Sequence, residues 1–120
     1  MRKFLLSTFF LLMLPAAHAE LSVSTFSVNF YNVPVNGSYQ TQSVFVQNTG
    51  AEVLNLEITN SCYDGFQVSS FDCDMALQPN GYCTINVQFQ PHHTGYVGCN
   101  INIYDNAGDF DTVNVSGSGI

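Results

Sequence analysis

Short runs of alternating apolar and polar residues dominate this chain and restrict it to a fold built from β-strands. In the clearest run, 83–89, Cys, Ile, Val and Phe alternate with Thr, Asn and Gln, and similar runs cover 42–47, 54–59 and 97–104. Turn sequences such as Pro79-Asn80-Gly81 separate the runs, and no stretch shows helical periodicity. Short strands at intervals of roughly 8 to 12 residues are typical of two packed sheets. We therefore predict an all-β domain, a β-sandwich of seven or eight strands.

Proline and glycine mark where two of these strands should end. Pro34 lies between Val33 and Val35 and indicates a sheet switch or an edge position, because proline cannot donate to a central ladder. Val113 and Val115 are expected in the last strand, with Gly117-Ser118-Gly119 as its exit.

The N-terminus predicts export. Met1-Arg2-Lys3 is a short positive segment, the run 4–14 is apolar apart from Ser7 and Thr8, and Ala17-His18-Ala19 is typical of a cleavage site. The apolar run is too short for a membrane-spanning helix of about 20 residues. We predict a signal peptide over 1–19 and one domain over 20–120. The mature protein should then lie in a bacterial periplasm or outside the cell, without membrane insertion.

Removing the signal peptide leaves a chain without lysine or arginine. Arg2 and Lys3 are the only two such residues, and their loss takes the formal charge from −7 to −9. Nucleic acids and anionic membranes are bound chiefly through Lys and Arg, so both are poor partners. Cationic partners, divalent metals and neutral glycans remain open.

The four cysteines predict two disulfides. Cys62, Cys73, Cys83 and Cys99 make an even number in a chain with an export signal. No Cys-x-x-Cys pair is present, which disfavours a zinc site. Four cysteines allow three pairings, and the residues alone do not choose among them.

Several segments resemble a known family. They are 44–50 (VFVQNTG), 65–68 (GFQV), 77–91 (LQPNGYCTINVQFQP), Thr94-Gly95 and Gly117-Ser118-Gly119. In order and spacing they are similar to the choice-of-anchor D type of exported immunoglobulin-like domain, related to the ASH/MSP/Hydin family. The resemblance implies an immunoglobulin-like sandwich, a scaffold that the family uses with many partners. It also implies a Cys73–Cys83 bridge and, with it, a Cys62–Cys99 bridge.

Motifs for catalysis and metal binding are weak. Asp105, Asp109 and Asp111 form a weak calcium candidate, but they lack the bidentate Glu of a calcium loop, and a solvated hairpin turn explains them better. Asp72-Cys73-Asp74 is interpreted as an acidic loop and His92-His93 as a surface loop. No Gly-x-Ser-x-Gly motif is present. We predict no enzyme, no metal and no cofactor.

The outward positions of the predicted strands carry aromatic residues. Phe45, Tyr82, Tyr96 and Tyr104 occupy this phase and are candidates for partner contacts, since Tyr is enriched at interfaces. They are also explained by pairing within the sheet. The leading hypothesis is a non-catalytic module that binds another envelope or extracellular protein through a sheet edge or a polar face. The alternative is a structural subunit that self-associates in a cell-surface or extracellular assembly.

Overall fold

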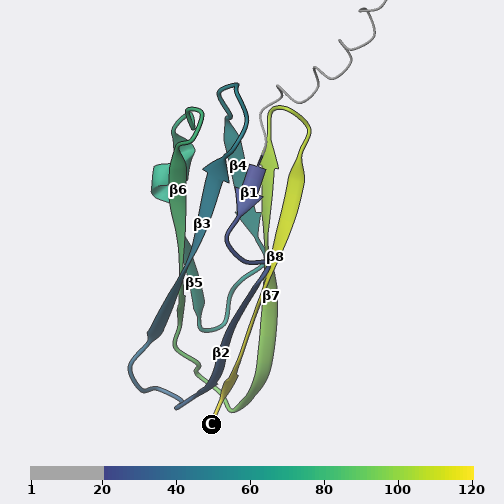
Figure 1. The fold of residues 1–120 in the computed structure, drawn as a ribbon. Coiled ribbons are helices and arrows are strands. Elements are labelled where there is room, and N and C mark those ends of the chain that lie inside the picture. Colours follow the sequence, from purple (N-terminus) through teal and green to yellow (C-terminus); the bar gives the residue numbers. More distant parts are fainter. Residues whose placement is uncertain (1–20) are drawn as a thin grey trace, which may run out of the picture.

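The protein is an all-β sandwich of eight strands in the computed structural model, which describes residues 21–120 (Figure 1). The strands are β1 Leu21–Val23, β2 Ser27–Val33, β3 Gln40–Asn48, β4 Leu56–Asn60, β5 Phe66–Ser69, β6 Tyr82–Phe89, β7 Gly95–Asp105 and β8 Phe110–Gly119. One four-stranded sheet has the order β1-β3-β6-β5 and is called the β3–β6 sheet here; the other, called the β7–β8 sheet, has the order β2-β8-β7-β4. The predicted fold class is confirmed. The predicted signal peptide, 1–19, lies outside the described residues.

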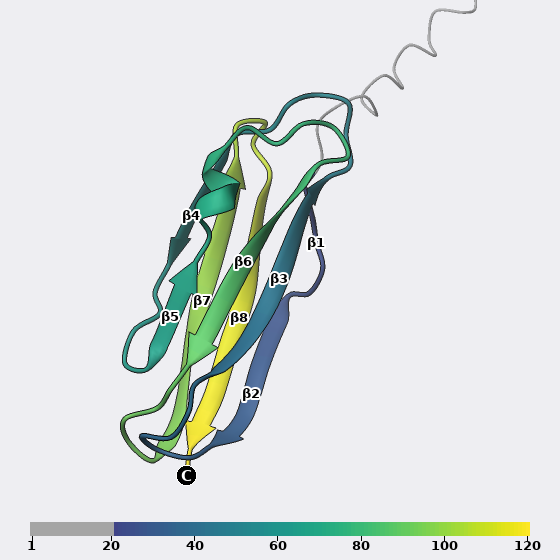
Figure 2. The same cartoon turned by 90° about the vertical axis from the view of Figure 1, so that its left-hand side faces the viewer.

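The N-terminal segment 21–33 is divided between the two sheets. β1 pairs antiparallel with β3, and after a short connection β2 pairs parallel with β8 (Figures 1 and 2). Backbone hydrogen bonds hold both ends of the connection: the N–H of Ser24 donates to Phe45 O, and Phe26 O accepts from Asn114 N–H, each at 2.9 Å. The sheet switch therefore lies at 24–26, while Pro34 directly follows β2, an edge strand.

The core lies between the sheets and is filled by the inward phase of each strand. Phe89 is fully buried at its centre. Its ring stacks on Phe66 at 4.4 Å between centroids and lies 5.5 Å from Phe30. Asn48 is the buried polar residue of the described chain: its Nδ2 donates to Glu52 O and Leu77 O, and its Oδ1 accepts from Gly50 N–H.

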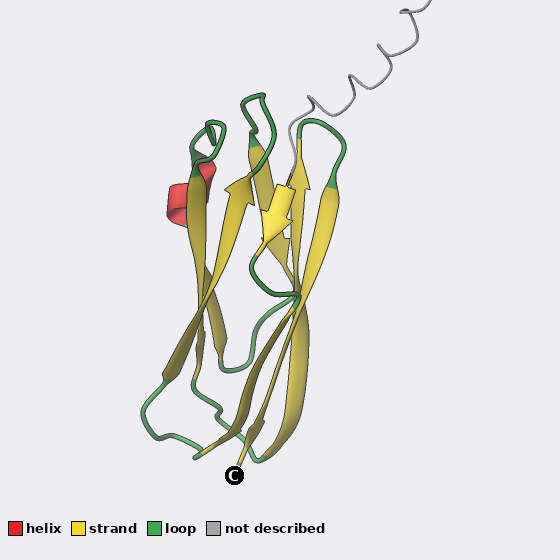
Figure 3. Cartoon of the chain, viewed as in Figure 1, coloured by secondary structure: helices red, strands yellow, loops and turns green. Residues whose placement is uncertain are grey.

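Two segments differ from the sequence prediction. The predicted acidic loop at Asp72 is a 3₁₀ turn, η2 (Phe71–Asp74), closed by the N–H of Cys73 donating to Ser70 O at 2.9 Å (Figure 3). The predicted exit 117–119 continues β8 and pairs with both β7 and β2. Glycine is required at Gly117 because an added Cβ would lie 2.5 Å from Phe89 Cε2.

Both disulfides connect edge elements to central strands. Cys62, just after β4, is bonded to Cys99 in β7, and Cys73 in η2 is bonded to Cys83 in β6. This is the pairing that the family resemblance implies. The described cysteines include no free thiol.

Candidate functional site

Exposed aromatic side chains are the most distinctive surface feature. All six tyrosines are at least 40% exposed: Tyr31, Tyr39, Tyr63, Tyr82, Tyr96 and Tyr104. Around them the outer faces carry mainly hydroxyl and amide side chains, for example Ser43, whose Oγ donates to Asn86 Oδ1 at 2.7 Å. Polar faces with exposed aromatic side chains suit contact with another molecule.

The four residues predicted to face a partner are all exposed, but they belong to separate surfaces. Phe45 and Tyr82 lie on adjacent strands of the β3–β6 sheet, with ring centroids 6.2 Å apart in an edge-on arrangement. Tyr104 and Tyr96 lie on β7 in the other sheet, near its opposite ends. The structure therefore joins Phe45 with Tyr82 and leaves Tyr96 apart from Tyr104.

Tyr104 has an aromatic neighbour that the sequence analysis missed. Phe110, the first residue of β8, is directly opposite Tyr104, and their ring centroids are 4.8 Å apart. The N–H of Asp105 donates to Asp109 O, so the next pair along the ladder, Tyr104 and Phe110, is a non-hydrogen-bonded pair, in which side chains come closer. The turn residues 106–109 could have predicted this pairing, because a hairpin centred on that turn places residue 104 opposite residue 110.

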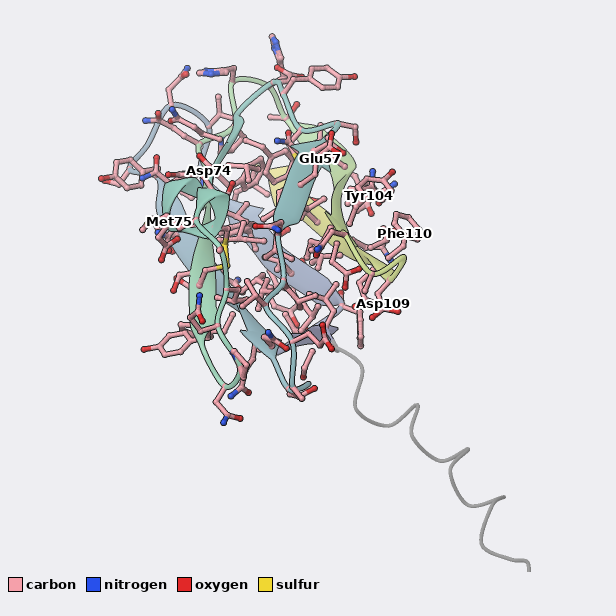
Figure 4. The ribbon with its side chains drawn as sticks, turned by 90° about the horizontal axis from the view of Figure 1, so that it is seen from above. Glu57, Asp74, Met75, Tyr104, Asp109 and Phe110 are labelled. Carbon is pink, nitrogen blue, oxygen red and sulfur yellow. A yellow bond between two sulfur atoms is a disulfide. The ribbon has the colours of Figure 1, made fainter. Side chains whose placement is uncertain are left out.

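Glu57 completes a row with these two rings across three strands. It is exposed on β4 and is the ladder partner of Tyr104. Figure 4 shows Glu57, Tyr104 and Phe110 in succession along one side of the molecule, with Asp109 beyond Phe110. Asp74 and Met75 lie apart from this row, at η2.

The acidic hairpin between β7 and β8 is closed by one of its own carboxylates. Asp105 Oδ1 accepts from the backbone N–H groups of Ala107 and Asp109, at 2.8 and 2.9 Å, which commits this carboxylate to closing the turn. Among residues 21–120, no group of three or more His, Cys, Asp or Glu side chains is placed to hold a metal ion. Burial raises the pKa of Asp111, and the charges of Asp109 and Asp105 raise this pKa further. Calcium binding by these three residues stays a prediction.

Half of β3 has an edge without a ladder partner, crossed only by the side chain of Gln42, whose Nε2 donates to Asn29 O in β2 at 2.8 Å. β1 pairs with β3 only at 46–48, and below it the chain has crossed to the other sheet (Figure 1). Phe45 uses its backbone groups toward Ser24, on the side away from β6. Since alternate residues of a strand direct these groups to the same side, Thr41 and Ser43 direct theirs to the open edge as well.

The described surface carries several shallow hollows. One of about 350 Å³ is lined by Tyr39, Gln88, Gln90 and His92, among others. His92 and His93 lie in the loop between β6 and β7, as predicted. In the described part of the chain, no helix is long and apolar enough to cross a membrane.

Comparisons with known proteins place the chain in a family. Residues 18–120 match the model of Cep192 domain 4. No curated protein sequence matches the chain. Among solved structures, it is similar to the ASH/PapD-like domain 7 of human CEP192, with a TM-score of 0.70 and 12% identity over 88% of this chain and 87% of that one.

Two further structures share the fold at low identity. WR4, an MSP family member of Caenorhabditis elegans, has a TM-score of 0.54 and 14% identity over 86% of this chain and 100% of its own. The Vibrio cholerae protease VesB has a TM-score of 0.66 and 19% identity over 82% of this chain, but the match spans only 31% of VesB. From the family match, the chain belongs to the Cep192 domain 4 family, and it shares its fold with the ASH/PapD-like domain 7 of human CEP192.

Proposed function

We propose that the chain is an exported, non-catalytic interaction module that accepts an extended segment of another protein along the open edge of β3. The observation that carries this proposal is the run of outward-facing backbone groups at Thr41 and Ser43. An added strand satisfies such groups, and main-chain hydrogen bonds provide the affinity. The ASH/PapD-like domain is a protein-interaction type of fold, which agrees with this role.

The side chains around the edge also favour strand addition. Gln40–Val44 contains no charged residue, proline or glycine, the features that usually protect an exposed edge. Phe45 follows directly and, with Tyr82, provides an exposed apolar contact on the same sheet. An incoming strand therefore has both backbone partners and an aromatic anchor.

Export and the finer family assignment are part of the proposal. Two disulfides indicate an oxidising compartment. The residues of 1–19 have the pattern of a cleaved signal peptide. Together they support a periplasmic or extracellular domain, and the segments 44–50 and 77–91 resemble the choice-of-anchor D type.

A second candidate partner is another copy of the chain. The absence of charge on Gln40–Val44 means that two such edges do not repel one another locally, although the whole chains do. The alternative function, a self-associating structural subunit, would use this same edge.

The test is to purify the tagged protein from the exported fraction of its host, with and without Ser43→Pro. Proline removes the outward N–H at the open edge and leaves the ladder between β3 and β6 intact, so the fold should persist. We expect a stoichiometric partner whose yield falls about tenfold in Ser43→Pro. Ser43→Ala, which keeps the N–H, should retain the partner.

Equal recovery with Ser43→Pro, or no stoichiometric partner, would contradict the proposal. A mass that rises with concentration in light scattering, and does so only when Ser43 keeps its N–H, would instead assign the edge to self-association.

A further inference from the structure

We infer that the outer face of the β7–β8 sheet holds a second binding site, formed by Glu57, Tyr104 and Phe110, for a lysine or arginine side chain of a partner protein. This surface is on the sheet opposite the β3 edge, so the inference goes beyond the proposed function. It assigns a partner chemistry, a basic side chain, to a separate part of the molecule.

The geometry joins an aromatic platform to a carboxylate. Tyr104 is 40% exposed and Phe110 is 53% exposed, with ring centroids 4.8 Å apart and ring planes inclined at 30°. Glu57 neighbours Tyr104 on the opposite side through the β4–β7 ladder. Directly paired residues on one face of a sheet have Cβ atoms about 5 Å apart, so a single cation can contact the carboxylate and a ring.

The local backbone makes this row rigid. The N–H of Asn106 donates to Asn55 O, and Asn106 Oδ1 accepts from Asn55 N–H at 2.8 Å, which ties β4 to the hairpin beside Glu57. On the other side, Asp105 closes the hairpin through two backbone N–H groups. The backbone that carries the three side chains is therefore fixed before a ligand arrives.

Charge selects the ligand. No lysine or arginine occurs between residues 4 and 120, so Glu57 has no basic side chain of its own domain to pair with. A cation over an aromatic face gains about 0.5–1 kcal/mol at an exposed site, and a carboxylate within reach adds to this gain. The acidic chain as a whole also attracts basic partners in solution.

The same charge argument separates this partner from other occupants. The described part of a second copy has no lysine or arginine to offer, so self-association does not fill the site. A neutral glycan would stack on the rings and donate hydroxyl hydrogen bonds to Glu57, but it carries no positive charge to pair with this carboxylate. A protein segment that presents Lys or Arg uses both features.

The test is an NMR titration of the disulfide-bonded protein with a synthetic peptide, acetyl-Thr-Arg-Thr-Arg-Thr-amide. The matched peptide replaces both arginines by citrulline, which has a similar shape without charge. We expect shifts centred on Tyr104 and Phe110, and an affinity for the arginine peptide about fivefold higher than for the citrulline peptide. Added salt should weaken binding of the arginine peptide alone.

Single substitutions distinguish peptide binding at this site from a general attraction of the basic peptide to an acidic protein. Glu57→Gln should lower the affinity about two- to fivefold, and Tyr104→Thr by a similar factor. Glu52→Gln removes one equally exposed carboxylate elsewhere and should have little effect, as should Ser43→Pro. Folding of each variant is checked by its amide spectrum.

Three results would overturn the inference. One is equal binding of the arginine and citrulline peptides. Another is an effect of Glu52→Gln as large as that of Glu57→Gln. The third is shifts at Tyr104 and Phe110 with a neutral oligosaccharide such as chitohexaose and none with the arginine peptide, which would assign the face to glycans. Because Ser43→Pro acts on the other sheet, failure of this inference is distinguishable from failure of the proposed function.

Discussion

Replacement of Gly117 by alanine should destabilise the domain more than a surface substitution of the same size. A Cβ at this position would lie 2.5, 2.8 and 3.1 Å from Cε2, Cδ2 and Cζ of Phe89. Phe89 is fully buried and stacked on Phe66, so its ring cannot withdraw without disturbing the aromatic core. The strand or the ring must shift, which is an overpacking change.

Overpacking of this kind costs about 1–3 kcal/mol. For a domain of this size, 1 kcal/mol lowers the melting temperature by roughly 4–8 °C, so we expect a decrease of about 4–24 °C. The measurement is thermal unfolding of the oxidised protein, followed by circular dichroism. Gly37→Ala is the matched control, because a Cβ there meets only ordinary contacts, 3.4 Å from Pro34 O. It should leave the melting temperature nearly unchanged or raise it slightly.

A double substitution tests the cause. Phe89→Leu shortens the opposing side chain and makes room for the added methyl group. If the clash is responsible, Gly117→Ala should cost about 1 kcal/mol less in the Phe89→Leu background than in the wild type. Equal melting temperatures for Gly117→Ala and the wild type, or strict additivity in the double variant, would refute the packing argument.

Three further predictions concern disulfides, charge and the buried amide. Cys62→Ser opens a loop of 37 residues and Cys73→Ser opens a loop of 10. On the loop-entropy estimate, loss of the first disulfide lowers the free energy of unfolding by about 4 kcal/mol and loss of the second by about 3 kcal/mol, which urea unfolding measures. A larger loss for Cys73→Ser than for Cys62→Ser would contradict that estimate. The pKa of Asp111 is raised in the folded state by burial and by neighbouring carboxylates, so the ionised form lowers stability as pH rises above the ordinary pKa of 3.8. Asp111→Asn should raise the melting temperature at pH 7 and leave it unchanged below pH 3, whereas equal effects at both pH values would rule out charge as the cause. Asn48→Asp keeps the acceptor for Gly50 N–H but loses the two N–H groups that donate to Glu52 O and Leu77 O. We therefore expect the free energy of unfolding to fall by about 3 kcal/mol. A loss below about 0.5 kcal/mol would show that water replaces the two bonds.

The strands were predictable from the sequence where one face of the strand is buried and the other is exposed to solvent. The run 83–89 alternates without error, and its apolar phase is the buried phase of β6. Paired strands with one buried face have a defined register, so turn residues such as Pro79-Asn80-Gly81 were enough to separate neighbouring strands. The exposed positions of Phe45 and Tyr82 followed from the same alternation.

Features that depend on contacts between distant segments were not predictable in this way. The sheet switch at 24–26 depends on hydrogen bonds to residues 45 and 114, which no local pattern encodes. The role of Gly117 depends on the ring of Phe89, 28 positions earlier in the chain. The local sequence Gly117-Ser118-Gly119 instead predicted the end of the last strand. Tyr104 was identified as a candidate contact, but its row with Phe110 and Glu57 required the pairing of three strands.

The parallel pairing of β2 with β8 affects how the domain responds to force. The described chain begins near one end of the sandwich and finishes at the other, and β2 and β8 run side by side in the same direction (Figure 1). A pull applied to the two ends therefore slides these strands past one another and loads their hydrogen bonds together instead of opening them one at a time. Forced unfolding is governed by the unfolding rate, and a shear-loaded terminal pair slows this rate. The topology that places β1 in one sheet and β2 in the other thus makes the domain resistant to a pull applied at its two ends.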